Sequence, residues 1–345
     1  MPEKDALEAI MTTRRFDKLI LGVAAVAVLA TAAATMVNPS KGVTAAPRVA
    51  FDQMHAEAAH LNEAVRNVAP DGPETASIAG GLGLQVMDDT TLLAEAFADM
   101  GYDLENVKRS GAAVPRVYLV KLPGDLHAVP EVSLKKTVFF HTMLPLILQE
   151  NERILADRRR LMRIKTEKAL GQKVSPGDRL WLAVLADRYK TSDDKLQTLL
   201  ARVDVIPPSL ALSQAAEESG WGTSRFAQRG NALFGQWTSA DDHGLVPKDR
   251  EAGMAHKIKA FGTLGQSVSA YMRNLNTHAA YRSLRKVRTQ LRAKGAPMDG
   301  HILAGALTKY SERGEKYVDS IRLIIEANDL RPLDDARLTS DDESA

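Results

Sequence analysis

The 345-residue chain contains no cysteine. That absence excludes disulfide bonds, cysteine-ligated zinc fingers, iron–sulfur clusters and thiol nucleophiles. The chain also lacks a charge excess, since 45 Lys and Arg residues stand against 43 Asp and Glu residues for a formal charge of +2. Nucleic-acid binding depends on a strongly basic surface, so we expect no nucleic-acid partner.

Several catalytic motifs are also missing. The eight histidines show no H-E-x-x-H spacing, and no G-x-S-x-G nucleophile elbow is present. We therefore expect neither a metal nor a cofactor. Aromatic residues make up only 5% of the chain, so each tryptophan attracts attention. The 45% apolar and 26% charged residues are typical of a globular protein rather than a disordered one.

A long apolar run lies near the N-terminus. No charged residue occurs between Lys18 and Lys41, and residues 19–37 are almost wholly apolar or small. As a helix this run would extend about 28 Å, close to the ~30 Å core of a bilayer. Basic residues before it predict a cytoplasmic lead over 1–18 and export of the chain after residue 37. An uncleaved signal-anchor and a cleaved signal peptide both fit, because residues 30–34 offer small-residue cleavage sites.

The exported part is predicted to be mainly α. Residues 38–112 are interpreted as a linker with one short amphipathic helix at 51–68. Helical patterns fill 113–200 and 201–330, although Pro145 should kink or break one helix. Alternation within 244–261 predicts a small β-hairpin. The acidic tail at 331–345 is expected to be disordered. A basic run from Arg273 to Lys294 fits either a solvated helix face or attraction to anionic polymer or membrane headgroups.

The segment SQAAEESGWGTSRFAQRGNALFGQW, residues 213–237, carries the strongest chemical signal. A helix from about Pro208 should end near Gly220, because glycines flank Trp221. Glu218 then lies in the last turn, at the edge of a stripe of small core residues, while Glu217 points further round. Helix carbonyls and an apolar wall such as Trp221 would both raise the pKa of Glu218. A carboxyl protonated near neutral pH is a general acid of the kind that glycosidases use, although two surface glutamates at a helix end remain the alternative.

These residues resemble a known family. A-A-x-E-S-G-W-G-x-S followed by N-x-L-F-G is similar to the glucosaminidase domain of glycoside hydrolase family 73, and most closely to its Bax-like bacterial proteins. The similarity runs from about 114 to 330 and includes FFHTMLPLILQENERILADRRRL and YSERGEKYVDSIRLIIEANDL. It implies a lysozyme-like helical catalytic domain over 201–330, a Bax-like helical part before it, and peptidoglycan glycan strands as the substrate. With the apolar run, it places the protein in the bacterial inner membrane, with its catalytic domain in the periplasm or cell-wall space.

The resemblance also assigns residues. Glu218 takes the place of the general acid, and Tyr310 resembles a tyrosine near the cleft, although Ser-Glu-Arg follows it here. Glu251 is the first candidate for a second carboxylate; alternatively, the 2-acetamido group of the substrate attacks the anomeric carbon itself. The residues expected to bind substrate are Trp221, Asn231, Phe234, Gln236, Trp237 and Tyr271.

The resulting function is endo-β-N-acetylglucosaminidase cleavage of β-1,4 bonds in the cell wall. A lytic transglycosylase or muramidase is the enzymatic alternative, because those lysozyme-like enzymes also end a helix with Glu-Ser. A non-catalytic wall-binding protein is the alternative from another class. The sequence does not identify protein partners.

Overall fold

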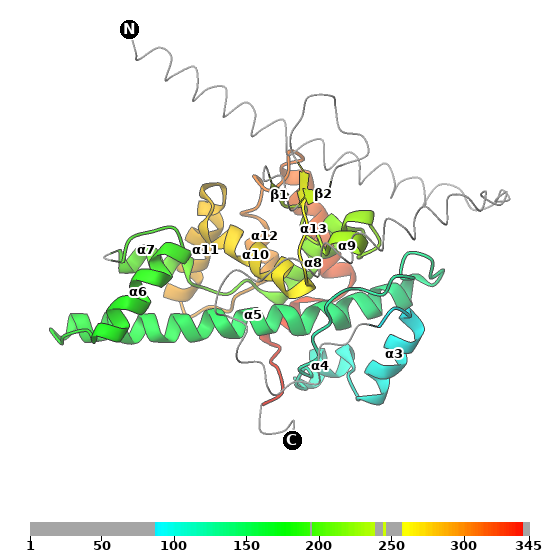
Figure 1. The fold of residues 1–345 in the computed structure, drawn as a ribbon, viewed down its shortest axis with the longest axis horizontal. Helices are drawn as coiled ribbons and strands as arrows, with labels where there is room; N and C mark the ends of the chain where they lie inside the picture. The colour runs from blue at the N-terminus through cyan, green and yellow to red at the C-terminus, as the bar shows by residue number, and fades with distance from the viewer. Residues whose placement is uncertain (1–86, 194, 239–243, 246–256, 341–345) are drawn as a thin grey trace, which may run out of the picture.

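The computed structural model describes residues 87–193, 195–238, 244–245 and 257–340, and within them the fold is mainly helical (Figure 1). The predicted fold class is confirmed to that extent. No helix among these residues is long and apolar enough to cross a membrane, and the segment 19–37 lies outside them. The helices are α3 (Thr90–Asp99), α4 (Leu104–Ser110), α5 (Val132–Ala169), α6 (Pro176–Arg188), α7 (Leu196–Arg202), α8 (Pro208–Ser219), α9 (Arg225–Gly230), α10 (Leu264–Thr277), α11 (Arg282–Ala293), α12 (Gly300–Ala304) and α13 (Glu315–Ala327), with 3-10 turns η1 (Ala279–Tyr281) and η2 (Arg331–Asp335).

Helix α5 is the long axis of the fold (Figure 1). Its 38 residues continue through Pro145, so of the predicted kink or break, the break does not occur. Proline removes one backbone donor and strains the preceding turn, at a cost of about 3 kcal/mol. Residues 138–148 of α5 are all buried, and that apolar burial keeps the helix continuous. Helices α3, α7, α8 and α10 pack along it.

Helix α8 lies at the centre of the described fold, packed between α13, α12, α5 and η2. Ten of its twelve residues are buried, from Pro208 to Ala216 and at Ser219. The predicted core stripe is therefore correct, but the helix is covered on every side. The two glutamates before its end are partly exposed and are the exception.

The linker predicted over 38–112 is wrong for residues 87–112, which fold into α3 and α4. Asp89 and Asp103 cap these helices by accepting hydrogen bonds from backbone N–H groups. Leu93, Phe97 and Val107 are buried in the same core as α5. The apolar positions are too few to reveal a helix by periodicity alone. The amphipathic helix at 51–68 lies outside the described residues.

The prediction of a disordered tail is likewise wrong for residues 331–340, which begin with η2. Leu333 and Leu338 are buried, and Leu338 forms an isolated parallel bridge with Val114. Asp334 accepts hydrogen bonds from the backbone N–H of Ser209 (2.8 Å) and of Gly300 (2.8 Å). One carboxyl therefore serves the first turns of both α8 and α12, so its negative charge has a local structural role that composition cannot reveal.

Replacing Asp334 with alanine is expected to lower the free energy of unfolding by about 2 kcal/mol, because two backbone donors lose their acceptor. Asp335 is exposed and provides the matched control, since its replacement with alanine removes the same charge. Urea denaturation of both variants measures the difference. Equal stability of the two variants would contradict the assigned role.

A small antiparallel sheet follows α9. It contains β1 (Trp237–Thr238), β2 (Gly244–Leu245) and β3 (Lys257–Lys259), in the order β1-β3-β2. Within the segment 244–261, β2 pairs with β3 as the hairpin prediction requires. The strand β1, which pairs on the other side of β3, was not predicted.

Candidate active site

The end of α8 is fixed by its Gly-Trp-Gly sequence. Gly220 and Trp221 both adopt left-handed backbone conformations, with φ of 58° and 60°. Gly222 follows with φ of 77°, and a Cβ atom there would lie 2.4 Å from Cδ1 of Leu122. The turn therefore requires glycine on steric grounds. It ends the helix directly after Ser219 and leaves Glu218 in the last turn, as predicted.

The carboxyl of Glu218 is held protonated close to neutral pH. Burial raises its pKa from 4.5 to about 7, and the charge of Glu217 raises it further. A hydrogen bond from Tyr317 and the charge of Arg313 act in the opposite direction. The residue nevertheless retains partial exposure. A carboxyl that is desolvated but reachable has the properties of a general acid at neutral pH.

Tyrosines supply the surroundings of Glu218. Burial raises the pKa of Tyr271, Tyr281, Tyr310 and Tyr317, and the charge of Glu218 raises each of them further. The rings of Tyr310 and Tyr317 are stacked, with centroids 5.3 Å apart. Sequence reasoning found Tyr310 but missed Tyr281 and Tyr317. Tyr317 precedes the buried Ile321 and Ile325 of α13 at a spacing of four residues. A tyrosine on the apolar face of a helix is the sequence feature that could have predicted its buried hydroxyl.

Glu217 is turned away from this group, as its predicted position on the helix implies. Its Oε1 lies 2.6 Å from Nη1 of Arg313, which also donates through Nη2 to Ser320. The pair holds the segment before α13 against the end of α8. The carboxylate of Glu217 is therefore engaged in an ion pair with Arg313.

Three of the predicted substrate-binding side chains have other contacts. The ring of Trp221 packs edge-on against Phe139 and Phe140 of α5, at centroid distances of 5.9 and 5.3 Å, rather than forming the predicted wall beside Glu218. Phe234 and Tyr271 stack on each other at 3.9 Å and are 3% and 0% exposed. Phe234 and Tyr271 are too deeply buried to line a groove, so the prediction is wrong for these two residues, whereas Trp221 is partly exposed. Phe234 and Tyr271 form packing beneath the site instead.

The N-x-L-F-G segment borders Glu218 through its backbone. Asn231 ends α9 in a left-handed conformation, and its side chain donates to the carbonyl of Phe261 (3.1 Å). Gly235 adopts φ of 59°, and a Cβ atom there would lie 3.3 Å from Oε2 of Glu218. Gln236 is partly exposed, and its carbonyl accepts from the backbone N–H of Lys259. The side chain of Trp237 and the whole of Glu251 lie outside the described residues.

Tyr310 lies in the same group, but its hydroxyl has a structural partner. It donates to the carbonyl oxygen of Phe234 at 3.1 Å. This bond connects the segment before α13 with the backbone directly before Gly235. The structure thus brings together Glu218, Tyr310 and the N-x-L-F-G segment, as the resemblance implies.

Comparison with known proteins decides the family. A model of the glucosaminidase family, described as mannosyl-glycoprotein endo-beta-N-acetylglucosaminidase, matches residues 194–330. Protein bax of Escherichia coli (strain K12) is 38% identical over 202 residues, which cover 56% of this chain and 69% of that protein. No solved structure matches. The chain belongs to the Bax-like proteins that carry a glucosaminidase domain.

The glucosaminidase domain takes in α7 to α13, and Glu218 lies within it in the last turn of α8. Within the described residues, no cluster of three or more His, Asp or Glu side chains is arranged to hold a metal ion.

The basic run on α10 and α11 is partly internal, which corrects its interpretation as a surface. Arg285 and Arg288 are buried and donate to backbone carbonyls, including those of Leu275 and Asp204. Arg292 forms an ion pair with Asp204, at 2.7 Å. Arg288 and Arg292 fasten α11 to the end of α7 and the residues after it, and Arg285 fastens α11 to the end of α10.

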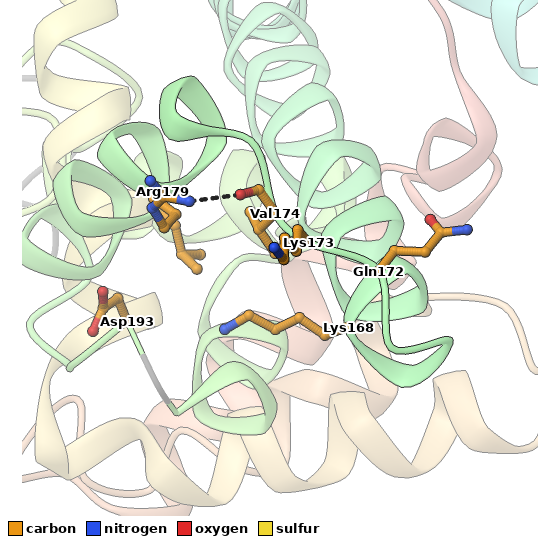
Figure 2. A pocket seen from close by; sticks show the side chains of 7 residues that line it. Lys168, Gln172, Lys173, Val174, Arg179 and Asp193 are labelled. Atoms are coloured by element: carbon orange, nitrogen blue, oxygen red, sulfur yellow. Dashed lines mark hydrogen bonds between the residues drawn. The ribbon is translucent and has the colours of Figure 1, made fainter.

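A separate pocket of about 370 Å³ lies where α5, α6 and the segment before α7 meet. Figure 2 shows Lys168 and Arg179 beside this space, with Asp193 across from Lys168. Nη1 of Arg179 donates to the carbonyl of Val174 at 2.8 Å. The pocket shares no lining residue with the group around Glu218.

Proposed function

We propose that this protein is a peptidoglycan hydrolase, an endo-β-N-acetylglucosaminidase that cleaves β-1,4 glycosidic bonds of cell-wall glycan. One arrangement carries the proposal: within the glucosaminidase domain, the partly exposed Glu218 lies in the last turn of α8 beside Gly235, where burial raises its pKa to about 7. In the reaction, Glu218 protonates the oxygen of the departing sugar as the glycosidic bond breaks. The lysozyme-like arrangement of the catalytic helices belongs to the same proposal.

The second catalytic group completes the scheme in one of two ways. Glu251 acts as the second carboxylate, or the 2-acetamido group of the substrate attacks the anomeric carbon. We do not assign this part to Glu217, because its carboxylate is already paired with Arg313. We propose that Trp221, Gln236 and Trp237 contact the glycan, and that Asn231 and Tyr310 hold the surrounding backbone.

We further propose that residues 19–37 anchor the protein in the bacterial inner membrane, with the glucosaminidase domain in the periplasm or cell-wall space. The uncharged run and the basic residues before it support this placement. A cleaved signal peptide would export the same domain without the anchor.

Mass spectrometry of purified peptidoglycan digested by the full chain tests the function. New reducing ends that carry N-acetylglucosamine are the expected product. Anhydro-muramic ends would identify a lytic transglycosylase, and muramic reducing ends a muramidase. Wall binding without new ends, equally strong in a Glu218→Gln variant, would identify a non-catalytic binding protein.

A further inference from the structure

A chain of buried hydrogen bonds joins Tyr271, Gln214 and Tyr317 beside Glu218. Gln214 lies one turn before Glu218 on α8 and is fully buried. The hydroxyl of Tyr271 donates to its Oε1 at 2.7 Å, and its Nε2 donates to the hydroxyl oxygen of Tyr317 at 2.8 Å. Both polar ends of the Gln214 amide are therefore engaged.

The direction of these bonds determines what Tyr317 does. A tyrosine hydroxyl has one proton to donate. Because the hydroxyl oxygen of Tyr317 accepts from Gln214, its own proton is free to point elsewhere. The carboxyl of Glu218 lies one turn after Gln214 on the same helix, and the interaction of the Tyr317 hydroxyl with it lowers the pKa of Glu218. Glu218 is therefore the acceptor to which we assign this proton.

We propose that Tyr317 is a positioning residue for Glu218. By donating to one carboxyl oxygen, the Tyr317 hydroxyl leaves the acidic proton to the other oxygen and stabilises the carboxylate that remains after proton transfer. Tyr271 and Gln214 act behind it by fixing the direction of the Tyr317 O–H bond. This inference rests on the proposed function only in treating Glu218 as the acid of a reaction.

Packing holds the hydroxyl in place. Tyr317 is 1% exposed, on the helix that packs most closely on α8, and its ring stacks on Tyr310 with an angle of 8° between the planes. Gly235 also lies beside the carboxyl, since a Cβ atom there would be 3.3 Å from Oε2 of Glu218. Glu217 and Arg313 also act on the pKa of Glu218. The charge of Glu218 in turn raises the pKa of the neighbouring Tyr271, Tyr281 and Tyr310.

Replacing Tyr317 with phenylalanine tests the proposal, since it removes the hydroxyl and keeps the ring. The donated bond favours the charged form of Glu218, so its loss should raise the pKa of Glu218 above the value of about 7. Carbon-13 NMR titration of glutamate-labelled full chain measures this pKa without any substrate, with the signal assigned by its absence in a Glu218→Gln variant. The pH at which activity on peptidoglycan declines on the alkaline side should rise with this pKa. The activity at the optimum pH should fall about 10-fold.

Tyr310→Phe is the matched control. It removes another buried hydroxyl of the same stacked pair, whose bond goes to the carbonyl of Phe234, so the pKa of Glu218 should stay in place. Tyr271→Phe should move the pKa in the same direction as Tyr317→Phe, because the Gln214 amide loses its anchor. An unchanged pKa in Tyr317→Phe would overturn the proposal, and would indicate that Gln214 is turned over and takes the Tyr317 proton itself.

The outcomes separate this proposal from the proposed function. A raised pKa in Tyr317→Phe supports the positioning role even if no variant digests peptidoglycan, in which case only the function fails. Conversely, digestion that depends on Glu218, together with an unchanged pKa and pH profile in Tyr317→Phe, leaves the function standing and removes the positioning role.

Discussion

Replacing Glu218 with glutamine is expected to lower the rate of glycan cleavage by about 10²–10⁴-fold, the usual contribution of a general acid. The amide keeps the volume of the side chain and can still accept the bond from Tyr317. It has no acidic proton to give to the departing sugar. Release of reducing ends from purified peptidoglycan near pH 6 measures the effect, because most of the wild-type carboxyl is protonated below its pKa of about 7.

Glu217→Gln is the control for this experiment. The two glutamates are adjacent on α8 and partly exposed, but Glu217 is paired with Arg313. Its replacement removes a negative charge that raises the pKa of Glu218, so the high-pH limb of the activity should move to slightly lower pH while most activity remains. The assignment of Glu218 fails if the two variants lose activity equally.

The same Glu218→Gln variant is expected to be more stable than the wild type in alkaline solution. The pKa of Glu218 is 4.5 as a free side chain and about 7 in the fold. A raised folded pKa means that stability is fully present below pH 4.5 and is lost as the pH rises through 7. Partial exposure reduces the penalty, so we expect glutamine to stabilise the fold by about 2 kcal/mol at pH 9 and by little at pH 4.5.

Urea denaturation of wild type and variant at both pH values gives this difference. Comparing the two proteins at each pH removes the contribution of other titrating groups, including Asp334, whose pKa is also raised, to about 6. Equal stability at pH 9 would mean that the fold does not penalise the ionised carboxyl. That result would contradict burial as the cause of the raised pKa of Glu218.

The position of Glu218 could be predicted because it depends on local rules. Two glycines around Trp221 end a helix wherever the rest of the fold lies, and small residues beneath Glu218 define its face of α8. Consecutive residues of a helix point in different directions, so helix geometry alone places the side chains of Glu217 and Glu218 in different environments. Arg313, which neutralises Glu217, lies 96 residues away, so only the direction of Glu217 was predictable and not its partner.

The partners of the aromatic side chains could not be predicted, because tertiary packing chooses them. Trp221 follows α8 in sequence, but its ring contacts Phe139 and Phe140, about eighty residues earlier. Phe234 and Tyr271 satisfy each other in the core. Aromatic residues near the Glu218 motif suggest a sugar-binding groove. Aromatic residues that stack in the core give the same pattern in the sequence, so the two cannot be distinguished from it.

Polar residues caused the remaining differences for a related reason. Asp334 in an acidic tail and Arg288 in a basic run both have the composition of a solvated surface. In the fold, Asp334 accepts from two helix N-termini and Arg288 donates to three carbonyls. Backbone groups left unsatisfied by distant elements set these roles, and a single sequence does not reveal where they lie.

The most direct test is the titration of Glu218 in the wild-type full chain, followed by the carbon-13 signal of its side-chain carboxyl. The account predicts a midpoint near pH 7, well separated from the free-side-chain value of 4.5. A midpoint near 4.5 would contradict it, because Glu218 would then be ionised at neutral pH and have no proton to donate.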